Sequence, residues 1–144
     1  MSPRKIAIAA VSAFAALVLT ACTSPGGSTT PSDSAAAEVD FCTAITNVTA
    51  ALKEQVAVGQ EQPADQAKLA TAYDNTVSAL QSAAAIAPDE YKAGLETLAT
   101  TYGNLADAAK SGDAAAIQTA EKATKSDDAL AAAKVLGQAQ GSCR

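Results

Sequence analysis

The sequence predicts an all-α protein, an antiparallel up-down four-helix bundle, and three observations carry this prediction. From residue 39 onward, apolar residues recur at steps of three and four, which is the period of a helix with one buried face. Alanine, the residue with the highest helix propensity, supplies 38 of the 144 residues. Glycine, proline and acidic residues divide this region into four segments, and the length of the chain allows one domain.

The first predicted helix begins at Asp40, which can cap it, and ends at Gly59. The second opens at Pro63, has Asp65 near its positive end, and stops before Pro88. The predicted inner face of the first helix is Phe41, Ile45, Val48, Leu52 and Val56. That of the second is Leu69, Tyr73, Val77 or Thr76, Leu80, Ala84 and Ala87.

The third predicted helix opens with two acidic residues, Asp89 and Glu90, which suit the positive end of a helix. Its apolar stripe is the most regular in the chain: Tyr91, Leu95, Leu98, Tyr102, Leu105 and Ala109. Such a stripe packs antiparallel helices at about 20°. Lys110 in the last turn, Gly112 beyond it and Asp113 as the next cap end this helix and begin another.

The fourth predicted helix begins at Ala114 and changes phase partway along. Its first half uses Ile117, Ala120 and Ala123 or Thr124 as the inner face, whereas Leu130 and Leu136 fall in a shifted phase. Residues 126–128, Ser-Asp-Asp, have the pattern of a new helix start. We therefore expect a kink or a short break there, with the helix resuming to about Gly137.

Residues 1–21 have the organisation of a secretory signal peptide. Two basic residues precede a run at 6–19 that is apolar apart from Ser12, and this run is too short to span a bilayer of ~30 Å. Residues 19–22, Leu-Thr-Ala-Cys, resemble a bacterial lipobox. This resemblance implies that a peptidase cuts before Cys22 and that Cys22 carries the lipid. The alternative is an ordinary signal peptide cut after Ala21, which leaves Cys22 unmodified.

Residues 22–38 are predicted to form a disordered, lipid-anchored linker to a folded domain at 39–144. The stretch from 23 to 34 is rich in Ser, Thr, Pro and Gly and contains no large apolar side chain, so it cannot bury enough surface to fold. As a flexible coil the linker spans on the order of 20 Å.

Three cysteines are an odd number for an exported chain. If Cys22 is acylated, Cys42 and Cys143 remain and can form one disulfide that closes the bundle. An even number of antiparallel helices brings both to the same end, whereas an odd number separates them by some 30 Å, far beyond the ~7 Å limit for bonded pairs. The turns at 60–62 and 110–113 then lie at the opposite end, the most accessible surface for a partner.

The composition excludes several kinds of chemistry. The chain contains no His, so imidazole catalysis and His-ligated metals are excluded. From residue 22 on there are eight basic and fifteen acidic residues, which argues against nucleic acid as a partner and against electrostatic attraction to anionic lipids. We expect no enzymatic activity, no cofactor and no metal, and membrane attachment through Cys22 alone.

Two groups of residues need a specific interpretation. Tyr73, Tyr91 and Tyr102 could ligate haem, but all three lie on inward stripes, where aromatic residues belong to the core. The acidic pairs at 89–90 and 127–128 lack the alternating ligands and the turn glycine of a calcium loop, and both suit a helix start. The structural interpretation is favoured for both groups.

The domain from 39 onward resembles small uncharacterised secreted or lipid-anchored proteins of actinobacteria. The resemblance rests on Asp-Phe-Cys at 40–42, Ala-Pro-Asp-Glu-Tyr at 87–91, and Cys143 next to the end. It implies this architecture and no assigned activity. The resulting hypothesis is a non-enzymatic lipoprotein on the outer face of the cell membrane that contacts an unknown envelope protein or glycan. The alternative is a carrier of haem or lipid.

Overall fold

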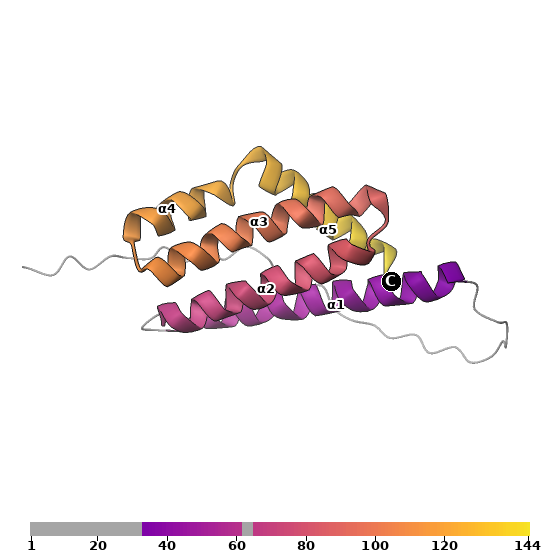
Figure 1. Cartoon of the computed structure of the whole chain (residues 1–144), viewed down its shortest axis with the longest axis horizontal. Helices are drawn as coiled ribbons and strands as arrows, with labels where there is room; N and C mark the ends of the chain where they lie inside the picture. The colour runs from indigo at the N-terminus through magenta and orange to yellow at the C-terminus, as the bar shows by residue number, and fades with distance from the viewer. Residues whose placement is uncertain (1–32, 62–64) are drawn as a thin grey trace, which may run out of the picture. The chain divides into compact units, whose positions relative to one another are not determined.

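The computed structural model of the chain describes residues 33–61 and 65–144, and all of their regular secondary structure is helical (Figure 1). The predictions for the signal peptide, for Cys22, for residues 22–32 of the linker and for Pro63 lie outside the described residues. The five helices are α1 (Asp33–Gly59), α2 (Gln66–Ile86), α3 (Asp89–Ser111), α4 (Ala114–Ala123) and α5 (Asp127–Ser142).

Helices α2 and α3 share the most extensive contact among the described helices. Helix α2 packs against α1 and α3, and α3 also packs against both α4 and α5. Helix α1 meets α5. In Figure 1, α4 and α5 follow one another along α3, and the chain ends beside α1. The described residues therefore form five helices, because the last predicted helix is divided in two.

The division occurs where the sequence predicts a break. Helix α4 ends at Ala123, and Ser126 caps α5 by accepting a hydrogen bond from the Ala129 amide at 3.3 Å. Two acidic residues then occupy the first turn of α5, where the helix dipole favours negative charge. The predicted end at Gly137 is wrong, since α5 continues to Ser142. The alanines of α5 offset the weak helix propensity of Gly137 and Gly141.

Helix α1 begins earlier than predicted. It starts at Asp33, so the last six residues assigned to the linker are helical and Asp40 lies inside the helix. Three consecutive alanines at 35–37 explain the difference, because they extend a helix at low cost once the turns that follow have formed. Figure 1 shows this first part of α1 reaching past the C-terminus.

The other helix ends follow the predicted signals. Asp65 is the N-cap of α2, and its carboxylate accepts from the amides of Ala67 at 3.0 Å and Lys68 at 3.2 Å. Gly112 ends α3 with a φ of 65°, a left-handed conformation that glycine adopts without strain. Asp113 caps α4 by accepting from the Ala115 amide at 2.8 Å.

Most predicted core residues are buried or half-buried, and a few are exposed. The main core cluster is Phe41, Ala44, Ile45, Val48, Leu80, Ala83, Ala84, Leu95, Leu98, Ala99, Ala132, Leu136 and Ala139. Of the two candidates on α2, Thr76 is fully buried and its hydroxyl donates to the Ala72 carbonyl at 3.0 Å. This bond satisfies the buried hydroxyl of Thr76. Val56 and Leu130, both predicted to face inward, are 55% and 51% exposed.

Candidate functional site

Cys42 and Cys143 are joined by a disulfide, as the sequence predicts, with their Cα atoms 5.2 Å apart. Cys42 lies in α1 and Cys143 immediately follows α5, so the bond joins two helices that are far apart in the sequence. Both cysteines are partly buried against the main core cluster. Lipidation of Cys22 remains a prediction, because that residue lies outside the described part of the chain.

We call the region around this bond the disulfide end. Phe41, next to Cys42, stacks on Tyr91 in the first turn of α3, with ring centroids 5.7 Å apart and an angle of 6° between the planes. The Gln140 amide donates to the Thr49 hydroxyl at 3.1 Å, which adds a polar contact between α5 and α1. A covalent bond, an aromatic stack and a hydrogen bond therefore join α1, α3 and α5 here.

The opposite, distal end contains the turn after α1 and the turn from α3 to α4. Lys68 in the first turn of α2 pairs with Glu61 at 3.1 Å, across the residues that separate α1 from α2. Lys110, in the last turn of α3, donates to Asp74 of α2 at 2.9 Å. This hydrogen bond to Asp74 raises the pKa of the Lys110 ammonium. Ion pairs between exposed side chains are therefore the electrostatic links across this end.

A shallow recess of about 460 Å³ lies at the distal end between the start of α2 and the end of α3. Its lining residues are Gln66, Ala67, Ala70, Thr71, Asp74, Ala109, Lys110 and Gly112. They include the Asp74–Lys110 ion pair, and Ala70 and Ala109 are buried. The recess offers polar groups and a narrow apolar floor at the end where the sequence predicts the most accessible surface.

The three tyrosines do not form one site. Tyr91 belongs to the disulfide end, whereas Tyr73 and Tyr102 lie together at the distal end with ring centroids 6.2 Å apart. Burial raises the pKa of both Tyr73 and Tyr102, and the negative charge of Glu121 raises that of Tyr73 further.

The acidic pairs occupy the positions that a structural role requires. Asp89 and Glu90 lie in the first turn of α3, and Asp127 and Asp128 lie in the first turn of α5. Within residues 33–61 and 65–144, no three His, Cys, Asp or Glu side chains are close enough together to hold a metal ion. The acidic pairs therefore stabilise the helix starts through the helix dipole.

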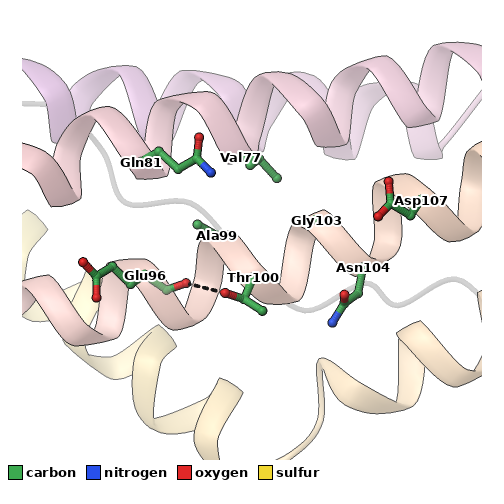
Figure 2. Close-up of a pocket in the computed structure, with 8 residues that line it drawn as sticks. All are labelled: Val77, Gln81, Glu96, Ala99, Thr100, Gly103, Asn104 and Asp107. Atoms are coloured by element: carbon green, nitrogen blue, oxygen red, sulfur yellow. Dashed lines mark hydrogen bonds between the residues drawn. The ribbon is translucent and has the colours of Figure 1, made fainter.

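Sequence analysis missed a second recess, of about 410 Å³, between α2 and α3 (Figure 2). Its lining residues are Val77, Gln81, Glu96, Ala99, Thr100, Gly103, Asn104 and Asp107. The signal was present, because residues 96, 100, 103 and 107 recur at helical spacing. Small and polar residues at helical spacing are typical of a solvent-exposed face. The sequence analysis therefore considered only the apolar stripe of this helix.

None of the described helices has the length and apolar character needed to cross a membrane. Comparison with protein-family models, with curated proteins and with solved structures finds no match to the chain.

Proposed function

We propose that the protein is a non-enzymatic cell-envelope lipoprotein, anchored through Cys22 on the outer face of the cell membrane. In this proposal its helical domain acts by contact with another envelope component, a protein or a glycan. The observation that carries the proposal is the Cys42–Cys143 disulfide, a bond suited to an oxidising compartment outside the cytoplasm. The basic and apolar run at the start of the sequence and its lipobox resemblance supply the route to that compartment.

The same proposal assigns an orientation. The linker joins α1 on the side of the disulfide end, so the disulfide end faces the lipid layer and the distal end faces away from it. The turn from α3 to α4 and the recess beside it are then the first surfaces that a partner meets. The net negative charge from residue 22 onward keeps the domain from lying against anionic headgroups.

The proposal includes a bundle with four members, in which α4 and α5 together form the fourth. Three observations support this arrangement. Both helices pack on α3, the break between them is only residues 124–126, and the disulfide returns the end of α5 to α1. Antiparallel packing with short connections is the common form of such bundles.

Anchoring is tested by comparing the wild-type chain with a Cys22→Ala variant expressed in a bacterium that processes lipoproteins. We expect the wild-type protein in the membrane fraction, with a diacylglyceryl group on Cys22 in mass spectra of its N-terminal peptide. The variant should be released from the membrane or retain its signal peptide. An unmodified Cys22 in a wild-type protein that still fractionates with membranes contradicts the proposed anchor.

Contact with a partner is tested by placing a photo-crosslinking amino acid at Ser111, in the distal turn, and at Gln138 on α5. Both positions are exposed, so the two variants are matched in accessibility. We expect one discrete crosslinked species from intact cells at Ser111 and a much weaker one at Gln138. Equal labelling at the two positions contradicts the assigned orientation, and repeated absence of any crosslinked species contradicts an interaction role.

A further inference from the structure

Helix α4 is held less firmly than the other described helices. It has ten residues and only one of them, Ala120, is buried, whereas each of the other four helices has at least four buried residues. Its main contact is with α3. Among the described residues, no ion pair and no side-chain hydrogen bond joins α4 to another helix. The packing of a few apolar side chains therefore keeps α4 in place.

The packing beneath α4 is the smaller of the two core clusters. Ile117 is the largest apolar side chain of α4, and it is only half-buried against this cluster. The rest of the packing comes mainly from α2 and α3: Tyr73, Tyr102, Leu105 and Ala108. When α4 moves away, an apolar surface that includes two aromatic rings therefore becomes exposed to solvent.

Both ends of α4 adjoin points where the chain can bend. Gly112, with a φ of 65°, precedes it, and residues 124–126 separate it from α5. Helix α5 is held independently of α4. Besides the disulfide, it has three residues in the main core cluster: Ala132, Leu136 and Ala139. Residues 112–126 therefore form a strap that is fixed at both ends, and α3 and α5 stay in place when it loosens.

A helix as short as α4 is marginal in water, because isolated helices of fewer than about 12–15 residues do not offset the cost of nucleation. When α4 loses its packing, it therefore loses its helical hydrogen bonds as well. We infer that α4 is a strap with two states: closed on the small cluster, as in the structure, and open by local unfolding while the rest of the domain stays folded. The inference goes beyond the proposed function, since it depends neither on the anchor at Cys22 nor on a partner.

Hydrogen exchange of the full chain in detergent micelles, followed by mass spectrometry of its peptides, tests the opening. Peptides that cover α4 should exchange at least about tenfold faster than those that cover the middle of α3 and α5, after correction for intrinsic rates. The rate in α4 should also rise little with urea below the unfolding transition, because local opening exposes little surface. Rates in α4 and α5 that are equal and rise together in urea overturn the inference.

Two substitutions in α4 should shift the opening equilibrium in opposite directions. Ile117→Ala removes the largest apolar contact of α4 and should speed exchange there about tenfold. Thr119 is exposed, and Thr119→Ala raises helix propensity, so it should slow exchange about twofold. Leu130→Ala is the matched control, because Leu130 lies outside α4 and is 51% exposed, and it should leave exchange in α4 unchanged. Exchange in α4 that responds to neither Ile117→Ala nor Thr119→Ala overturns the inference.

Thiol labelling tests whether the opening uncovers the small cluster. Ala120 of α4 and Ala132 of α5 are both buried, so Ala120→Cys and Ala132→Cys, each combined with Cys22→Ala, are a matched pair of variants. Under non-reducing conditions, a thiol-reactive reagent should modify position 120 at least about tenfold faster than position 132. Adding Ile117→Ala should raise only the first rate. Equal rates at the two positions overturn the inference, and circular dichroism checks that all variants keep the wild-type helix content.

Discussion

The disulfide end and the distal end of the helical domain are held together by different forces. The main core cluster contains thirteen buried residues, and the disulfide and the Phe41–Tyr91 stack lie at its edge. The second cluster has only three, Leu105, Ala108 and Ala120, with Tyr73 and Tyr102 packed at its side. Stability is therefore concentrated at the disulfide end. The distal end has the short α4, exposed ion pairs and a recess, so it can change conformation at a lower cost in free energy.

Removal of the disulfide should cause the largest change in the free energy of unfolding. Replacing both cysteines, as Cys42→Ser with Cys143→Ser, should lower the free energy of unfolding by about 4 kcal/mol, because the bond closes a loop with a sequence separation of 101. Urea unfolding followed by circular dichroism measures the change. Adding a reducing agent to the wild-type protein should reproduce it, and a loss far below 2 kcal/mol would show that packing alone joins α1 to α5.

A second test compares one leucine from each cluster. Leu95 is fully buried in the main cluster, and Leu105 is 5% exposed in the small one. Leu95→Ala should cost about 3 kcal/mol of unfolding free energy and Leu105→Ala about 2 kcal/mol, because a sparsely packed site relaxes around a cavity more easily. The same urea experiment measures both. A larger loss at Leu105 would reverse the assignment of the stable end.

A third test uses two glycines of α3. A Cβ atom at Gly94 would lie 2.6 Å from Val135 Cγ1 of α5, whereas one at Gly103 has open space around it. Gly94→Ala should therefore destabilise the protein by about 2 kcal/mol through overpacking. Gly103→Ala should stabilise it by about 0.5 kcal/mol through helix propensity. Adding Val135→Ala to Gly94→Ala should restore part of the loss, and a harmless Gly94→Ala would mean that α3 and α5 separate readily.

The smallest test concerns the half-buried phenols of the distal end. Unfolded tyrosines lose their protons near pH 10.0, whereas folded Tyr73 and Tyr102 have raised pKa values and keep theirs to higher pH. The contribution of these protons to stability is complete well below pH 10.0 and is lost as the pH rises through the folded pKa values. Replacing both residues with Phe should flatten this loss, measured by urea unfolding at a series of alkaline pH values. An unchanged slope would show that other groups cause it.

Sequence reasoning succeeded where one physical signal dominated. The stripe of α3 has the clearest 3-4 period, and each of its residues is buried or packed against the core. Cap residues such as Asp113 and Gly112 mark helix ends because their hydrogen bonds and backbone conformation are local. The disulfide forms although the described helices number five, because α4 and α5 follow one another along α3 and so return the end of the chain to α1.

The errors arose where tertiary context outweighs local signals. Val56 lies on the apolar stripe of α1 but is exposed. Helix α1 packs against α5 near the disulfide, whereas among the described helices it makes no comparable contact with α4, which could have covered Val56. Thr76 was one of two candidates, and its helix-internal hydrogen bond lets it occupy the core. The recess shown in Figure 2 was missed because small and polar residues carry no periodic apolar signal.

The position of the disulfide also governs how the molecule responds to mechanical load. A pull applied between the N-terminal segment and Arg144 passes from Cys42 directly to Cys143 through one covalent bond. The polypeptide between these two residues carries none of that tension. A load on the C-terminus can therefore be borne without unwinding the helical segments between the two cysteines, for as long as the two sulfurs stay oxidised.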